Sequence, residues 1–190
     1  MRCLLCQSWS LRYICKTCEE LHLKPSLQKR VLPNGLEVYY FYKYKEIEEL
    51  IKSKYFFIGY FIYRTLARLS FKEFSKSFLF DEKVYAFACD ASIKNGYSNT
   101  SLLSRYLKSN TIKPLYNKLI STTNISYAGK TLDFRLRNPK QFEYKFKSNI
   151  NAILVDDTVV SGTTLSQAEK ELAKYNVNVL FAITLCDAKE

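Results

Sequence analysis

The chain has 190 residues, a length typical of one domain that carries at most a small appendage. Hydrophobic residues make up 47% of it and aromatic residues 15%, a composition that excludes a largely disordered chain. Its 29 Lys and Arg residues against 18 Asp and Glu residues leave a net charge of +11, which favours nucleic acid, a phosphorylated metabolite or an acidic membrane surface as partner, although AT-rich coding produces the same lysine excess.

The sequence predicts neither a transmembrane segment nor a secretory signal. The longest apolar runs, such as residues 55–63, are too short to cross a bilayer, and this one ends at Arg64. The first nine residues contain cysteines where a signal peptide has its hydrophobic core. We therefore expect a cytoplasmic protein with reduced thiols, and a peripheral position at the inner-membrane face stays open.

Two Cys-x-x-C pairs occupy the first 26 residues, which we expect to form a separate zinc ribbon. Cys3 and Cys6 form one pair, Cys15 and Cys18 the other, and eight residues lie between them. Each pair turns tightly enough to bind one ion, and together they supply the four tetrahedral ligands that Zn²⁺ prefers. A unit this small buries too little core to fold unaided, so a structural metal would stabilise it. Two disulfides are the alternative, and His22 is an alternative ligand that we expect at the surface.

Residues 27–190 are predicted to form one α/β domain. Apolar residues recur at spacings of three and four over 46–76, which predicts one or two amphipathic helices with a break at Gly59. Residues 122–147 are basic and polar and show little pattern. Elsewhere, aromatic and β-branched runs indicate strands and capped amphipathic segments indicate helices. The predicted strands are 36–45, 83–89, 151–157 and 177–186, and the further helices are 101–109 and 163–175.

The tail has the clearest pattern, strand, loop, helix and strand within about 35 residues, which is a βαβ unit of a parallel sheet. Ligand sites in such sheets lie beyond the carboxyl ends of the strands. Asp156 and Asp157 lie at such an end, before the loop 158–162. In that loop Gly162 permits close approach, and the following helix start offers free amides and a positive dipole end to a phosphate.

The residue types around this loop predict a ribose 5-phosphate site. Carboxylates are acceptors, so Asp156 and Asp157 suit the vicinal hydroxyls of a ribose or a Mg²⁺ carried by a polyphosphate. Hydroxyls of Ser161, Thr163 and Thr164 can donate to phosphate oxygens. The alternative is an ordinary βα turn whose acids cap the next helix.

The stretch ILVDDTVVSGTT resembles the fingerprint of type I phosphoribosyltransferases, which bind phosphoribosyl pyrophosphate with Mg²⁺. The resemblance implies a parallel sheet flanked by helices, with Asp156 and Asp157 at the ribose hydroxyls. Val160 stands where the purine-salvage members have an additional acid, so purine salvage is disfavoured and this loop provides no general base. The resemblance further implies that the 5-phosphate is held by the loop residues Thr158, Val159, Val160, Ser161, Gly162, Thr163 and Thr164.

A four-cysteine ribbon followed by this domain resembles the ComF family, also called ComFC. That resemblance implies a role in natural transformation, the uptake of single-stranded DNA and its handling in the cytoplasm. The middle of the chain departs from the family pattern. Residues 88–90 read Ala-Cys-Asp in place of Val-Pro-Val, and residues 95–98 read Asn-Gly-Tyr-Ser in place of Arg-Gly-Phe-Asn. Tyr127 replaces a Gln, whereas Arg135 and Asn138 remain.

These departures bear on pyrophosphate binding. Asn95 and Ser98 replace residues of a loop that faces pyrophosphate in the family, and an Arg lost at Asn95 removes a charge-assisted bond worth roughly 1.5 to 3 kcal/mol. Lys94 is the nearest basic substitute for binding phosphoribosyl pyrophosphate. Ligand binding can survive this loss more readily than fast pyrophosphate transfer.

Three functions are compatible with the sequence. The first is a competence protein that binds phosphoribosyl pyrophosphate and single-stranded DNA, with Tyr40, Tyr42 and Tyr44 as candidates for base stacking or, as alternating strand residues often are, for the core. The alternative is an active phosphoribosyltransferase with an unknown small nucleophile. A third is a regulatory module that passes a signal to a DNA-uptake helicase or another competence protein.

Overall fold

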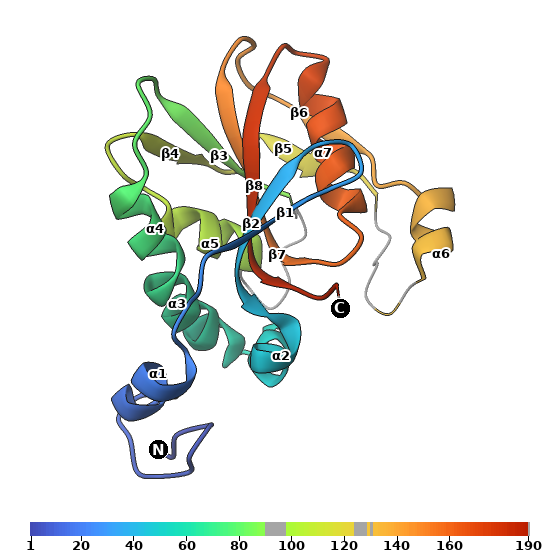
Figure 1. Ribbon diagram of the computed structural model, residues 1–190. Coiled ribbons are helices and arrows are strands. Elements are labelled where there is room, and N and C mark those ends of the chain that lie inside the picture. Colours follow the sequence, from blue (N-terminus) through green and yellow to red (C-terminus); the bar gives the residue numbers. More distant parts are fainter. Residues whose placement is uncertain (90–97, 124–128, 130, 190) are drawn as a thin grey trace.

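A six-stranded sheet lies at the centre of the computed structural model, which describes residues 1–89, 98–123, 129 and 131–189 (Figure 1). The strand order is β1-β2-β8-β7-β3-β4. β1 is antiparallel to β2, and the other neighbours are parallel, which confirms the predicted α/β class. The strands are β1 (Gln28–Val31), β2 (Glu37–Lys43), β3 (Val84–Ala88), β4 (Ile112–Leu115), β7 (Asn151–Val159) and β8 (Asn178–Asp187).

β7, which contains Asp156 and Asp157, lies in the interior of the sheet, with β8 on one side and β3 on the other. Val155 pairs with Ile183 of β8 and with Ala88 of β3. A parallel strand covered on both faces needs apolar side chains at successive positions, and residues 152–155 are accordingly all buried. The predicted βαβ unit of the tail is therefore confirmed.

One face of the sheet is covered by the helices between β2 and β4, most of which lie on the left of Figure 1. The predicted break at Gly59 is confirmed, because α3 begins at that residue. The apolar spacing over 46–76 places Leu50, Ile62 and Phe71 in the core against Ile183 of the sheet. These elements are α2 (Tyr44–Lys52), a 3₁₀ turn η1 (Ser53–Tyr55), α3 (Gly59–Leu69), α4 (Phe71–Ser77) and α5 (Asn99–Tyr106).

The opposite face carries α7 (Thr163–Ala173) and a two-stranded antiparallel sheet of β5 (Leu119–Ser121) and β6 (Phe142–Tyr144). Leu165 and Leu172 of α7 are buried against Leu154 and Ala182. A short helix, α6 (Leu132–Arg137), stands away from the central sheet at the right of Figure 1. β6 and α6 both fall in the stretch that showed little pattern in the sequence.

The aromatic stretch 36–45 is only partly a strand. β2 ends at Lys43, and Tyr44 begins α2. Tyr42 is 2% exposed and donates its hydroxyl to the carbonyl of Leu23 at 3.0 Å, so it belongs to the core and cannot stack on a nucleic-acid base. Tyr40 is half-buried and donates to the Oε1 of Gln28.

The N-terminal head, residues 1–26, lies at the lower end of the molecule in Figure 1 and contains α1 (Lys16–His22). Its buried side chains, Cys3, Ile14 and Cys18, join the same core as α3. The head is thus packed on the α/β body. Among the described residues, no helix combines the length and the apolar character needed to cross a bilayer.

Candidate functional site

The paired acids lie inside β7, whose ladder continues further than the sequence indicated. Thr158 and Val159 were expected in the loop, yet they pair with Cys186 and Asp187 of β8. The long partner strand extends the hydrogen-bonding ladder through these two positions, and Val159 is buried. The connecting loop is therefore only residues 160–162, between β7 and the first residue of α7.

Asp157 has a cationic partner that is remote in sequence. Lys54, in η1, donates from its Nζ to the Oδ2 of Asp157 at 2.8 Å. Tyr63 of α3 donates its hydroxyl to the same oxygen at 3.2 Å, and this hydroxyl also lies 3.4 Å from the carbonyl oxygen of Ile51. The negative charge of Asp157 is thus compensated by a lysine 103 residues before it.

Lys54 keeps its charge in this environment. Burial works to lower its pKa, but the neighbouring Asp157 carboxylate, through its charge and its hydrogen bond, outweighs burial and raises the pKa above the ordinary value. The side chains of Lys54 and Asp157 are 23% and 14% exposed. The contact is therefore a partly buried ion pair, screened less by solvent than a surface pair.

Asp156 lies beside Asp157 in the chain but not on the same side of the sheet. Successive side chains of a strand point to opposite faces, and Asp157 points to the face of α3. Asp156 is half-buried, and its Oδ1 accepts the backbone N–H of Asp157 at 2.8 Å. Each carboxylate therefore approaches the carboxyl edge of the sheet from a different face, which reduces the repulsion between them.

The short loop leads directly into the amino terminus of α7. Gly162 is the N-cap residue and has the left-handed conformation, with φ +77° and ψ 2°. The hydroxyls of Ser161 and Thr163 lie 2.7 Å apart, and Thr164 is half-buried in the first turn. The amide groups of this turn and the positive end of the helix dipole form a site suited to an anion.

A single arginine fixes the loop from the hairpin of β1 and β2. Arg30 donates from a terminal nitrogen to the carbonyl oxygen of Val160 at 2.6 Å, and its Nε lies 2.9 Å from the Oδ2 of Asp187. The side chain of Asp187 is 6% exposed, at the end of β8. Arg30 thus connects an edge strand, the loop and a central strand.

The two cysteines outside the head are both buried in the core of the α/β body. Cys89 is 1% exposed and Cys186 0%. Burial raises the pKa of Cys186 to about 12, so its thiol stays neutral beside the hydroxyl of Thr158, 3.4 Å away. The Cys186 thiol thus belongs to the buried core that packs around β7.

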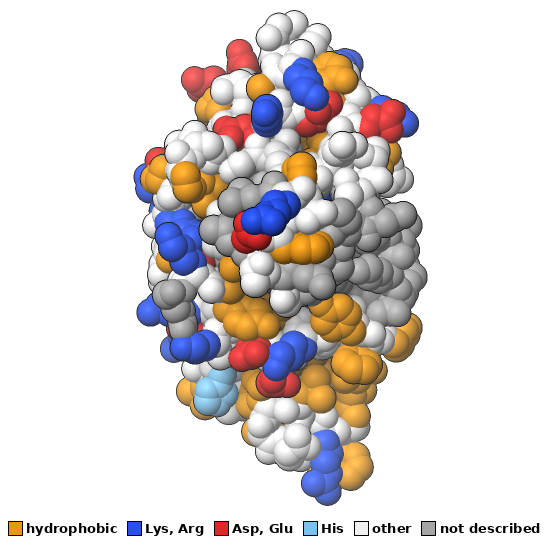
Figure 2. Space-filling view, turned by 90° about the vertical axis from the view of Figure 1, so that its right-hand side faces the viewer, with side chains coloured by type: hydrophobic (Ala, Val, Ile, Leu, Met, Phe, Trp, Pro, Cys, Tyr) orange, Lys and Arg blue, Asp and Glu red, His pale blue; other side chains and the backbone are white. Residues whose placement is uncertain are grey.

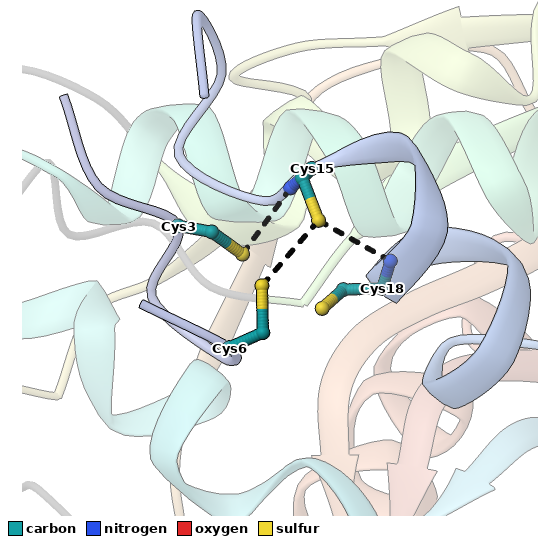
Figure 3. A group of neighbouring side chains, drawn as sticks. All are labelled: Cys3, Cys6, Cys15 and Cys18. Atoms are coloured by element: carbon teal, nitrogen blue, oxygen red, sulfur yellow. Dashed lines mark hydrogen bonds between the residues drawn. The ribbon is translucent and has the colours of Figure 1, made fainter. Parts of the chain in front are cut away.

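The four cysteines of the head form one cluster, as Figure 3 shows. Their sulfur atoms all lie within 4.8 Å of one another. The Sγ atoms of Cys6 and Cys15 are 3.7 Å apart, close to the roughly 3.8 Å edge of a tetrahedron with 2.3 Å zinc–sulfur bonds. The backbone N–H of Cys15 donates to the sulfur of Cys3, and that of Cys18 to the sulfur of Cys15. Four thiolates so arranged can hold a metal such as zinc.

The cysteines differ in how readily they ionise. Burial opposes ionisation of Cys3, but hydrogen bonds from the backbone at Cys6 and Cys15 outweigh it and lower the pKa of Cys3 to about 6. The pKa of Cys18 is raised, first by burial and then by the neighbouring thiols. Thiolate character, the form that binds metals, therefore concentrates on the first pair.

The head contacts α3 through two side-chain pairs. The ring centroids of Tyr13 and Phe61 are 4.9 Å apart. Arg68 of α3 forms an ion pair with Glu19, whose side chain is 7% exposed. The cysteine cluster is thus attached to the helix that also carries Tyr63.

Sequence reasoning missed three residues of the site, Lys54, Tyr63 and Arg30. The spacing over 46–76 assigned apolar residues to the core but gave no signal for Lys54, which lies in the 3₁₀ turn between α2 and α3. Lys94, Asn95 and Tyr127, which the sequence singled out, lie outside the described residues.

The later family positions have structural roles. The hydroxyl of Ser98 caps α5 by accepting the N–H of Ser101 at 3.1 Å. Asn138 ends α6, and its Nδ2 donates to the carbonyl of Phe134 at 2.9 Å. Neither of these contacts points to a ligand.

Comparisons with known proteins were made at three levels. No family model matches the chain, and no curated protein matches it. Among solved structures it is similar to a hypoxanthine phosphoribosyltransferase from Staphylococcus aureus, with 14% identity and a TM-score of 0.44 over 66% of this chain and 62% of that one. The chain thus spans less than two thirds of that enzyme.

Two further structures match over more of their length. An adenine phosphoribosyltransferase is 13% identical, with a TM-score of 0.40 over 90% of this chain and 88% of that one. An orotate phosphoribosyltransferase from Mycobacterium tuberculosis is 13% identical, with a TM-score of 0.39 over 90% and 82%. These likenesses are too distant to assign a function, which depends on the residues at the end of β7.

Proposed function

We propose that this protein binds phosphoribosyl pyrophosphate at the carboxyl end of β7. One observation carries the proposal: two carboxylates in the last four residues of a central parallel strand precede a three-residue loop that leads into the amino terminus of α7. The loop and first turn, residues 160–164, would hold the 5-phosphate, and the acids would accept bonds from the ribose hydroxyls.

Mg²⁺ enters this proposal with the ligand, because it neutralises a pyrophosphate. The carboxylate of Asp157 does not fit a metal as it stands, since its Oδ2 already accepts bonds from Lys54 and Tyr63. Zn²⁺ is proposed separately, as a structural ion held by the four cysteines of the head.

Calorimetry with phosphoribosyl pyrophosphate and Mg²⁺ tests the site. We expect the wild-type chain to bind and the Asp156→Asn/Asp157→Asn variant to lose at least about tenfold in affinity, because two acceptors of the ribose become weaker. Asp133→Asn, which changes an exposed acid on α6, serves as the matched control and should bind normally. Equal binding by all three proteins would remove the ligand from this site.

The cellular role that we propose is that of a ComF-like competence protein that handles incoming single-stranded DNA in the cytoplasm. The net charge of +11 and the resemblance of the head and tail to that family support it. Exposed aromatic side chains near the head, Trp9, Phe56 and Phe57, are suited to stacking on bases, each stack being worth roughly 1 to 3 kcal/mol. Figure 2 shows hydrophobic side chains gathered on the lower part of the molecule, toward the head.

Oligonucleotide binding tests this role independently of the ribose site. We expect affinity for single-stranded DNA to fall steeply with salt, and the Trp9→Ala/Phe57→Ala variant to bind more weakly at every salt concentration. Leu79→Ala, which changes an equally exposed apolar residue outside this aromatic group, is the control. DNA binding that is absent, or unaffected by the aromatic changes, would contradict the proposed role of these side chains.

The alternative is phosphoribosyl transfer to an unknown small nucleophile. The loop argues for binding over catalysis, because residues 158–164 contain only Thr, Val, Ser and Gly and thus no side chain that takes a proton at neutral pH. Release of pyrophosphate with any acceptor in a broad panel of bases and amines, abolished by Asp156→Asn, would establish the enzyme instead.

A further inference from the structure

The negative charge of Asp157 is compensated by a cation of the chain itself, Lys54. Resting on the proposed function, we propose that Lys54 is the fixed counter-cation of the ribose site, so that Asp157 accepts a sugar hydroxyl without a divalent ion. Lys54 is then a binding residue, although it lies in the 3₁₀ turn between α2 and α3, far in sequence from the loop of β7.

The two carboxylate oxygens of Asp157 differ in their contacts. Among the described residues, the side-chain contacts from Lys54 and Tyr63 both fall on Oδ2. Oδ1 is therefore left to accept a bond from a ligand hydroxyl. Tyr63 is anchored by a second contact, to the carbonyl of Ile51, so the carboxylate is held from two directions and its orientation is fixed before the ligand arrives.

A divalent ion on the same oxygen is disfavoured by this arrangement. Mg²⁺ requires carboxylate oxygens at about 2.0 to 2.1 Å in octahedral geometry. The ammonium group of Lys54, 2.8 Å from Oδ2, already takes one acceptor position of that oxygen. The lysine remains protonated, since the Asp157 carboxylate raises its pKa, so the ion would also meet a like charge in a partly buried setting.

Ribose 5-phosphate can show whether Lys54 or Mg²⁺ supplies the positive charge at the site, because this ligand has no pyrophosphate to carry Mg²⁺. Its binding is measured by calorimetry on the full zinc-loaded chain, in chelator-free buffer without added Mg²⁺ and again with Mg²⁺ in excess. We expect the wild-type affinity to differ by less than about twofold between the two buffers, because the counter-charge is supplied by Lys54. A wild-type protein that needs Mg²⁺ to bind ribose 5-phosphate would overturn the inference.

Lys54→Met provides the decisive comparison. Without Mg²⁺ we expect its affinity to fall about ten- to hundredfold, the range for a hydrogen bond to a charged group. Added Mg²⁺ should restore most of that loss, because the vacated Asp157 oxygen then becomes available to the ion. Lys52→Met is the matched control, since Lys52 lies two residues away, is 49% exposed and pairs only with acids of its own helix among the described residues.

Two further variants keep the test decisive. Lys54→Gln asks the same question with a polar side chain if the methionine variant does not fold, and Tyr63→Phe keeps the cation and should stay independent of Mg²⁺. Unchanged affinity of the Lys54 variants would overturn the inference while leaving the proposed site intact. Failure of the wild-type chain to bind either ribose 5-phosphate or phosphoribosyl pyrophosphate would overturn the site and this inference together.

Discussion

Leu32 packs directly against Gly162: a side-chain carbon added at Gly162 would lie 2.5 Å from both terminal methyl groups of Leu32. Leu32 is buried at the turn between β1 and β2, whereas Gly162 begins α7. The hairpin therefore packs against the start of α7 at Gly162, and the glycine is required there for two reasons, its positive φ and the contact with Leu32.

Replacing Gly162 should destabilise the protein more than replacing a glycine whose only constraint is its positive φ. Gly162→Ala is expected to lower the free energy of unfolding by roughly 2 to 4 kcal/mol, from left-handed strain plus overpacking. Gly35→Ala is the matched control, because Gly35 also has a positive φ but no atom within 4 Å of the added carbon, so about 1 kcal/mol is expected. Urea unfolding measures both, and the costs of Gly162→Ala and Leu32→Ala should be less than additive in the double variant, because the smaller side chain makes room for the added carbon. Equal costs at the two glycines would contradict the packing explanation.

Arg30 should be more important for stability than its neighbour on the same strand. Arg30→Met leaves Asp187 without its cation at 6% exposure, and we expect a loss of roughly 2 to 4 kcal/mol, slightly below the range for fully buried pairs. Lys29→Met removes an ion pair with Glu37 that is 46% and 40% exposed and screened by solvent, so a much smaller change is expected. Chemical denaturation of both variants makes the comparison, and equal effects would show that Arg30 is not held as described.

Removing zinc should disorder the head before the body. Trp9 is the only tryptophan of the chain and pairs with Arg2 next to the cysteine cluster, so its fluorescence reports on the head. A strong chelator or Cys6→Ser should shift this emission and lower Tm by about 2 to 4 °C for each kcal/mol lost, while the far-ultraviolet circular dichroism at low temperature changes little. Lys16→Ala, an exposed change in the same head, should alter neither signal. Absence of bound zinc in the purified protein would contradict this prediction outright.

Glu169 gives a pH dependence of known sign. Burial raises its pKa above the ordinary value of 4.5, and the bond from Asn34 only partly offsets this effect. The folded state therefore holds the proton more tightly than the unfolded state, so this group's contribution is fully present below pH 4.5 and is lost as the pH rises through the folded pKa. Glu169→Gln should remove that loss, because the amide is never ionised yet can still accept from Asn34. Unfolding curves from pH 4 to 8 check this, and a parallel pH dependence in both proteins would refute it.

The C-terminal βαβ unit was predictable because its pattern depends on residues that are close to one another in the sequence. Residues 152–155 form a continuous apolar run, and the helix after Gly162 repeats its apolar positions at helical spacing, so the βαβ unit and the acids at its strand end follow from the sequence. β1 was missed because three of its four residues, QKRV, are polar, as an edge strand with alternate exposed positions tolerates. β5 and β6 have three residues each, too few for a periodic pattern.

The site was predictable only in part, for a different reason. The sequence showed which oxygens lie at the end of β7 but not which cation meets them, because a lysine in a helical segment 103 residues away carries no local signal. The partners of Asp157 are determined by how α3 packs against the sheet, and this packing exists only in the folded core. The same holds for Arg30, whose partners lie on β8 and in the loop.

Helix α3 contacts both the head and the candidate site. Its Phe61 packs on Tyr13 of the head, and two residues later Tyr63 donates to Asp157. A displacement of this one helix would change both contacts at once, so under the proposed function we expect metal occupancy and ligand affinity to be reciprocally coupled. A truncated chain that starts after the head would consequently misreport the affinity of the intact protein.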